Sequence, residues 1–208
     1  MLMLPPSSDT RTLCIHLVRH GTHNEYGRVL SGRAGAPVLV AAGRTQANRM
    51  ARWAGTGAAT AIHASPRERT METAAIIAAH HGLPVEIVPA LDEVDFGSWN
   101  GMAFADLDGD PLWEKWNAHR SSAATPGGET MNQSIGRAVA HMEIVARSRA
   151  GETILCVTHC DIIRGILAHY LGLDLDHLLR FDIDPGSVST VILDGANGRV
   201  TRMNEVPA

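Results

Sequence analysis

Short apolar runs alternate with longer amphipathic stretches along this chain. Their length and composition predict buried strands over residues 12–18, 59–64, 85–88 and 154–157. The stretches between and after them predict helices over about 42–54, 66–81, 130–149 and 161–171. Strands that alternate with helices favour an α/β fold of three layers, in which a mostly parallel central sheet carries helices on both faces.

Cap and turn residues mark two further boundaries in this pattern. Ser65 and Glu68 are spaced as a capping box, and Pro66 would take the first helical position, where its missing N–H costs nothing. Near the carboxyl end, Asn197 and Gly198 predict a tight turn between apolar runs at 187–193 and 199–203. The last predicted element is therefore a β-hairpin.

The organisation of the chain is expected to be simple. The 208 residues, 45% of them hydrophobic, are enough for one sizeable core, so residues 1–208 are expected to form a single domain. Residues 1–11 are interpreted as a flexible tail, because their apolar start is too short for a signal peptide. Residues 95–128 are interpreted as a lid or loop insertion, whose tryptophans are expected to pack rather than to bind a ligand.

Charge and cysteine content narrow the possible partners and location. A net charge of -4 gives no reason to expect attraction to nucleic acid or to a membrane surface, so an anionic ligand needs a local site. The cysteines, Cys14, Cys156 and Cys160, form no Cys-x-x-Cys pair and fit a reducing cytoplasm. Polar residues interrupt every apolar stretch before it reaches the length of a membrane span. Oligomeric state cannot be predicted from these features.

Cationic residues follow three of the predicted strands. Arg19 and His20 end the first strand, Arg67 follows the second, and His159 follows the strand at 154–157. Ligands of α/β sheets bind outside the carboxyl ends of the strands, so these side chains are expected to share one site. Guanidinium groups bind phosphate oxygens in a bidentate fork, and a neutral imidazole can act as a nucleophile. The pattern therefore indicates phosphoryl transfer.

Such a reaction also needs a proton for the leaving alkoxide. A carboxylic acid near the mouth of the site, with its pKa raised by burial, can supply it. Asp92, Glu93 and Asp95 are the candidates in this sequence.

Several blocks of the sequence resemble the histidine phosphatase superfamily, also called phosphoglycerate-mutase-like, whose hallmark is a strand that ends in Arg-His-Gly. In the family order, the blocks lie at residues 17–21, 64–70, 91–101, 127–130 and 157–159. The resemblance covers roughly residues 12–195. It implies the phosphoglycerate-mutase-like form of the three-layer fold and catalysis through a covalent phosphohistidine, without a metal ion or another cofactor.

The resemblance also implies roles for individual residues. His20 would be the nucleophile, and Glu93 would be the proton donor. Arg19, Arg67 and His159 would complete the phosphate pocket.

Other positions of the blocks have looser assignments. Glu129 and Thr130 would lie near the phosphate pocket, where they would orient a histidine or touch the phosphate. Asn24 is a candidate for a further phosphate contact, although it follows the Arg-His-Gly at a shorter spacing than is typical of the family. Cys160 stands where members commonly have glycine, and neither it nor His23 receives a role.

The predicted function is that of a phosphatase of small phosphate monoesters. A phosphoglycerate mutase uses the same pocket, but such enzymes generally carry longer insertions than residues 98–125 provide. Two further hypotheses are a metal hydrolase and a phosphate-binding protein without activity. The sequence has no Gly-x-Gly-x-x-Gly turn after the first strand and no Cys-x5-Arg motif, and its one lysine, Lys115, does not lie in a P-loop. The leaving group of the substrate stays open.

Overall fold

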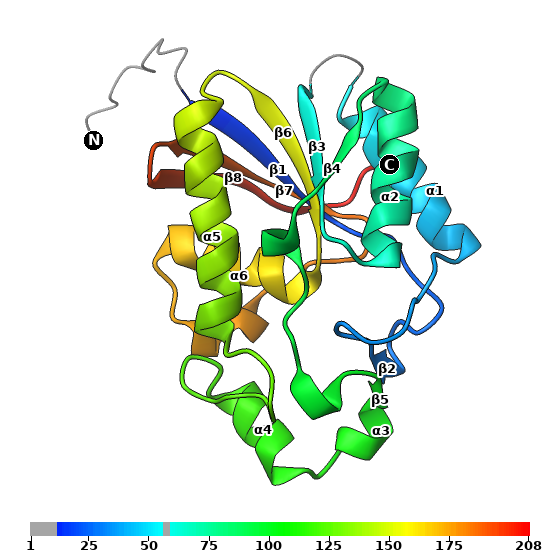
Figure 1. Cartoon of the computed structure of the whole chain (residues 1–208), viewed down its shortest axis with the longest axis vertical. Coiled ribbons are helices and arrows are strands. Elements are labelled where there is room, and N and C mark those ends of the chain that lie inside the picture. The colour runs from blue at the N-terminus through cyan, green and yellow to red at the C-terminus, as the bar shows by residue number, and fades with distance from the viewer. Residues whose placement is uncertain (1–11, 56–58) are drawn as a thin grey trace.

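A six-stranded sheet forms the centre of the computed structural model, which describes residues 12–55 and 59–208 (Figure 1). The strands run in the order β4-β3-β6-β1-β7-β8. Their bounds are β1 Leu13–Arg19, β3 Ala61–Ala64, β4 Val85–Ile87, β6 Thr153–Thr158, β7 Val188–Asp194 and β8 Asn197–Glu205. The pairs β4·β3, β3·β6 and β6·β1 are parallel, whereas β7 and β8 join antiparallel. The predicted tail lies outside the described residues.

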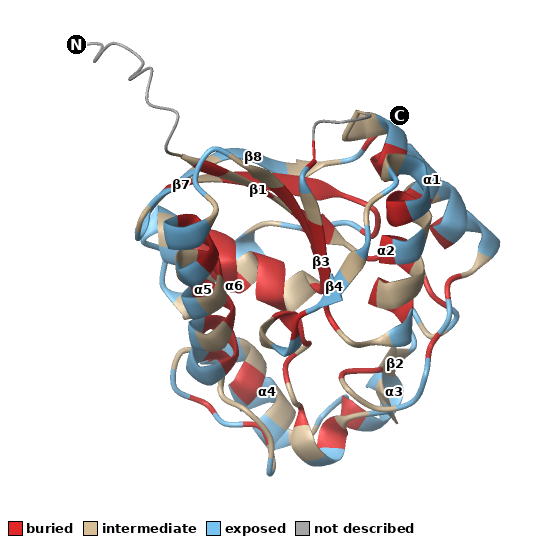
Figure 2. Ribbon diagram, turned by 45° about the horizontal axis from the view of Figure 1, so that its top comes forward, coloured by how far each residue is buried: buried red, intermediate tan, exposed pale blue. Residues whose placement is uncertain are grey.

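Helices cover both faces of this sheet (Figure 1). On one face lie α1 (Ala41–Trp53) and α2 (Glu68–His81), and on the other lie α5 (Met131–Ser148) and α6 (Cys160–Leu171). Each face has its own apolar cluster: Val18 of β1 packs with the first helix pair, and Leu17 beside it packs with the second. Buried residues follow the sheet and the inward sides of these helices (Figure 2). The three-layer prediction is therefore confirmed.

The hairpin at the carboxyl end is present, but its turn is not where the sequence indicated. Asn197 and Gly198 are already part of β8 and pair with Asp194 and Leu193. The turn residues are Gly195, which has a φ of 58°, and Ala196. Glycine adopts this left-handed conformation without the steric cost of a Cβ, which explains why it, rather than the Asn-Gly pair, makes the turn.

The start of α2 also differs from the prediction. The helix begins at Glu68, and its N-cap is Arg67, whose side chain makes no capping hydrogen bond. The hydroxyl of Ser65 instead lies 2.7 Å from Nε2 of His159 and 3.2 Å from Oδ1 of Asp92. The capping-box prediction is wrong because a long-range contact engages the serine.

Residues 95–128 form short elements rather than an irregular loop. They comprise η2 (Gly97–Trp99), β5 (Met102–Ala103), α3 (Phe104–Leu107) and α4 (Pro111–Ala118). β5 pairs antiparallel with β2 (Val29–Leu30). Trp99 and Trp116 are buried in the main core, as expected for packing residues. The short sheet holds this segment beside the loop that follows β1.

Two further 3-10 helices complete the described chain. They are η1 (Pro89–Leu91), which ends two residues before the predicted acid Glu93, and η3 (Leu175–Arg180), after α6. Among the described residues, no helix is both long and apolar enough to cross a membrane.

Candidate active site

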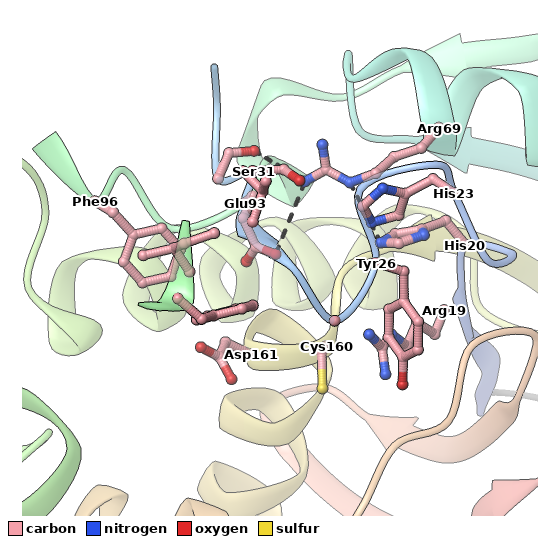
Figure 3. Close-up of a pocket in the computed structure, with 15 residues that line it drawn as sticks. Arg19, His20, His23, Tyr26, Ser31, Arg69, Glu93, Phe96, Cys160 and Asp161 are labelled. Carbon is pink, nitrogen blue, oxygen red and sulfur yellow. Dashed lines mark hydrogen bonds and ion pairs between the residues drawn. The ribbon is translucent and has the colours of Figure 1, made fainter. Parts of the chain in front are cut away.

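A cavity of about 250 Å³ opens at the carboxyl ends of β1 and β6 (Figure 3). The chemically reactive or charged side chains on its wall come from four stretches of the chain: Arg19, His20, His23, Arg69, Glu93, Cys160 and Asp161. The edge of the sheet therefore collects these groups as the strand-end rule predicts.

His20 occupies the first position after β1 and is 3% exposed. Its Nδ1 donates a hydrogen bond to the carbonyl of Gly21 at 2.9 Å, which leaves the lone pair on Nε2. Nε2 is 3.3 Å from Nε of Arg69. Burial, together with the charges of Arg69 and Arg19, holds the pKa of His20 well below its usual range. The ring is therefore a neutral imidazole whose unprotonated Nε2 lies at the cavity and accepts a hydrogen bond from Nε of Arg69.

Close backbone packing fixes the loop that carries this histidine. A Cβ built on Gly21 would lie 2.4 Å from the carbonyl oxygen of Gly43 in α1, and a Cβ on Gly43 would lie 2.1 Å from the carbonyl oxygen of Thr22. The amide of Gly21 also donates to Oγ1 of Thr73 in α2 at 3.1 Å. Only glycine fits at these two positions, so the glycine of the Arg-His-Gly block holds the nucleophile candidate against two helices.

Two guanidinium groups face the same cavity. Arg69 is 2% exposed and donates from Nη2 to the carbonyl of Gly32 at 2.9 Å, while its Nη1 is buried without a hydrogen-bond partner. Arg19 donates from Nη1 to the carbonyl of Ile183, and its guanidinium carbon lies 5.4 Å from the centre of the Tyr26 ring. A buried donor without a partner is costly, so a bound anion that accepts from Arg69 would relieve that cost.

His159 follows β6 and is fully buried. Its Nδ1 accepts from Nη2 of Arg69 at 3.0 Å, so its Nε2 donates to Oγ of Ser65 at 2.7 Å. The serine hydroxyl in turn donates to Asp92 at 3.2 Å. Burial and the charge of Arg69 hold the pKa of His159 well below its usual range. This chain of hydrogen bonds fixes the ring 5.4 Å from that of His20, measured between ring centres.

Of the three carboxylates considered from the sequence, Glu93 is the one on the cavity wall. Its Oε2 lies 3.6 Å from Nδ1 of His159 and 4.0 Å from Nη2 of Arg69. Burial first, and then the charge of Asp161, raise the pKa of Glu93 to about 7. The raised pKa favours the protonated form of Glu93, which a general acid needs.

The other two carboxylates are engaged elsewhere. Asp92 pairs with Nε of Arg67 at 2.9 Å and accepts from the amide of Glu93 at 2.8 Å. Asp95 accepts from the side-chain amide of Asn100 at 2.7 Å. Both stabilise the loop around Glu93.

The sequence predicted Arg67 as a phosphate-binding arginine, but the structure places Arg69 on the cavity wall in its stead. The guanidinium of Arg67 pairs with Asp92 and donates to the carbonyl of Arg33 at 3.1 Å, and the residue does not line the cavity. The difference follows from the late start of α2, because residue 67 precedes the helix and residue 69 lies in its first turn. Helical spacing was the available signal, since Arg69 shares a buried face with Thr73 and Ile77.

Three other candidates from the sequence also lie off the cavity wall. Asn24 is exposed. Glu129 bonds Arg33 at 2.8 Å and Arg137 at 3.0 Å; although burial alone would raise the pKa of Glu129, Arg137 lowers it to about 2. Thr130 is the N-cap of α5. The structure brings none of them to His20.

Two residues without an assignment do line the cavity. His23 is 8% exposed, its ring centre lies 5.3 Å from that of His20, and burial lowers its pKa to about 4. The thiol of Cys160 donates to the carbonyl of Ile183 at 3.6 Å, and burial raises its pKa to about 11. Both side chains are therefore neutral near pH 7, and the cysteine is a poor nucleophile.

The guanidinium groups of Arg19 and Arg69, the neutral imidazole of His20 and the carboxyl group of Glu93 line one cavity, while the predicted His159 contacts Arg69 but is not part of the wall. Such a set of groups is suited to a protein that binds a phosphoryl group and transfers it through nitrogen. The sequence model described as histidine phosphatase superfamily (branch 1) matches residues 15–206. The chain belongs to this superfamily.

Individual relatives agree with this assignment. Over 187 residues, the chain is 33% identical to the bifunctional protein Rv2228c of Mycobacterium tuberculosis; the match covers 87% of this chain but 51% of the relative, so the chain spans about half of that relative's length. It is 26% identical to phosphoserine phosphatase 1 of Hydrogenobacter thermophilus, with 81% of each chain covered. The solved structure of YhfR from Bacillus stearothermophilus superimposes with a TM-score of 0.87 at 26% identity and covers 93% of this chain and 98% of that one.

Proposed function

We propose that this chain is a metal-independent phosphatase that hydrolyses small phosphate monoesters through a phosphohistidine on His20. The observation that carries the proposal is the unprotonated Nε2 of a neutral His20, which accepts from Arg69 on the wall of a cavity that Arg19 also lines. The phosphatase name of the Hydrogenobacter relative supports hydrolysis. The substrate in that relative's name is not assigned to this chain.

In the first step, Nε2 of His20 attacks phosphorus, so that an N–P bond forms and the bond to the ester oxygen breaks. Arg19 and Arg69 stabilise the negative charge on the equatorial oxygens. His159 is proposed to bind a phosphate oxygen by donating from Nδ1, which requires that the phosphate take over Nη2 of Arg69 and that Nε2 of His159 accept from Ser65 in place of donating to it. Glu93 gives its proton to the leaving oxygen.

In the second step, water takes the place of the leaving alcohol. The carboxylate of Glu93 accepts a proton from this water as its oxygen attacks phosphorus, and the N–P bond breaks. The hydrogen bond from Nδ1 of His20 to the carbonyl of Gly21 stabilises the positive ring of the phosphohistidine and restores the same tautomer afterwards.

The proposed location and partners of the enzyme are those expected from its charge and cysteine content. The proposed enzyme is cytoplasmic, acts on a small-molecule phosphate ester, and has no nucleic-acid or membrane partner. Residues 1–208 are proposed to act as one domain, in which residues 95–128 border the cavity.

Activity should not depend on a metal ion, because the two arginines supply the positive charge that Mg²⁺ supplies in other phosphoryl transfers. Purified protein assayed with p-nitrophenyl phosphate and a panel of alkyl phosphates should show the same rates with and without excess EDTA. Loss of activity that Mg²⁺ or Zn²⁺ restores would instead support a metal hydrolase.

Glu93→Gln should lower kcat by about 10² or more for esters with poor leaving groups, because it removes the proton donor. With p-nitrophenyl phosphate the loss in the first step should be smaller, since this leaving group needs little protonation.

For poor leaving groups, the rate of the wild-type protein should also fall as pH rises above about 7, where Glu93 loses its proton.

The matched control for this variant is Asp95→Asn, which changes a nearby carboxylate that does not line the cavity. A dependence on the leaving group in Asp95→Asn and not in Glu93→Gln would show that the acid has been misassigned.

A further inference from the structure

Apolar side chains also line this cavity and form a wall, and one of them, Tyr26, packs over the guanidinium group of Arg19. Tyr26 and Phe104 line the cavity although they are 46% and 38% exposed, and Val29, Leu30 and Phe96 are the other members of this wall. Large apolar side chains at the mouth of a polar pocket gain little from the protein core. They gain contact area when a ligand covers them.

The described lining residues offer no cation for a second negative group of the substrate once the phosphate is bound. Among the described residues that line it, Arg19 and Arg69 are the cations, and a phosphate dianion engages both. His23 is neutral because burial lowers its pKa to about 4. The leaving-group side is therefore without a cation of its own.

A carboxylate that is paired with two arginines behind it also lines the cavity. Asp161 lines the cavity across from Glu93 (Figure 3). Its Oδ2 is 2.7 Å from Nη1 of Arg120, and its Oδ1 is 3.6 Å from Nη1 of Arg164. Burial alone would raise the pKa of Asp161, but these two arginines hold it below its usual range. Neither arginine lines the cavity, so what a ligand meets is the carboxylate.

We propose that this site selects phosphate monoesters whose leaving group is an uncharged, ring-bearing alcohol and discriminates against leaving groups that carry a carboxylate. The inference rests on the proposed phosphatase function. The ring packs on the wall of Tyr26 and Phe104, and Asp161 repels a carboxylate. Phosphoserine and phosphoglycerate carry a carboxylate near the ester, so both should be poor substrates of this chain. In this respect the chain should differ from the Hydrogenobacter relative, which is named as a phosphoserine phosphatase.

The test compares benzyl phosphate with 4-carboxybenzyl phosphate, whose alcohols have similar acidity and size and differ in charge. The wild-type protein should prefer benzyl phosphate by at least about tenfold in kcat/KM, which corresponds to about 1.4 kcal/mol. Asp161→Asn should lower this ratio at least about threefold, because the carboxylate is removed while Arg120 and Arg164 remain. The matched control is Asp182→Asn, which changes another partner of Arg164 outside the cavity and should leave the ratio unchanged.

A second measurement tests the apolar wall without changing any charge. Phe104→Ala should lower kcat/KM for benzyl phosphate about fivefold and that for ethyl phosphate less than about twofold, since ethyl is too small to cover the ring.

Each outcome decides one of the two proposals. Equal or faster hydrolysis of the carboxylated ester, or an unchanged ratio in Asp161→Asn, would overturn the selectivity. So would a protein that hydrolyses alkyl phosphates but not benzyl phosphate. If no ester is hydrolysed and no phosphoenzyme forms, the proposed phosphatase function itself fails.

Discussion

His20→Ala should lower kcat by at least about 10⁴-fold on every phosphate ester that the wild-type protein hydrolyses. The alanine removes the nitrogen that attacks phosphorus, while both arginines and the acid stay in place. Binding and charge stabilisation alone leave a small residue of catalysis. The measurement is kcat with p-nitrophenyl phosphate, supported by a circular dichroism spectrum to show that the variant is folded.

His23→Ala is the matched control for this loss. His23 is also buried and lines the same cavity, and its ring centre is 5.3 Å from that of His20. Because it has no part in bond formation, its replacement should cost less than about tenfold in kcat. Comparable losses in the two variants would mean that general damage to the cavity, and not removal of a nucleophile, explains the first result.

Arg69→Ala should lower kcat/KM by about 10³-fold, because it removes a buried cation aimed at the transferring phosphoryl group. Arg69→Lys should recover little, since an ammonium group does not reproduce the fork that contacts His20, His159 and Gly32. The same kinetic assay measures both variants.

Arg67→Ala tests whether the phosphate is bound by Arg69, as the structure indicates, or by Arg67, as the sequence predicted. Arg67 pairs with Asp92 and does not reach the cavity wall, so its loss should cost less than about tenfold in kcat/KM. A larger loss in Arg67→Ala than in Arg69→Ala would restore the sequence-based assignment of the phosphate arginine.

The positions of these two arginines show what the sequence can predict and what it cannot. Strand and helix periodicity placed β1, β6 and the helices to within a few residues, and with them His20 and His159. The inward arginine depends on the first residue of α2, which is Glu68, while Ser65 bonds His159 and does not cap the helix. That contact joins residues 94 positions apart in the chain.

Long-range partners explain the other differences. Glu129 lies in a family block, but its ion pair with Arg33 spans 96 positions and holds it away from His20. The apolar wall was not predicted because Val29 and Leu30 belong to a two-residue strand and Phe104 to a four-residue helix. Elements this short are below the length at which a periodic pattern can be detected.

The central claim of this account is a covalent phosphohistidine on His20. The direct measurement is a rapid alkaline quench of the wild-type protein during turnover of a radiolabelled phosphate ester, followed by peptide mapping. We expect at most one phosphoryl group per chain, on the peptide that contains His20, stable in alkali and lost in acid as a phosphoramidate is. No label should be found in His20→Ala. Label on His159 or on a cysteine of the wild-type protein, or turnover without any labelled intermediate, would contradict the account.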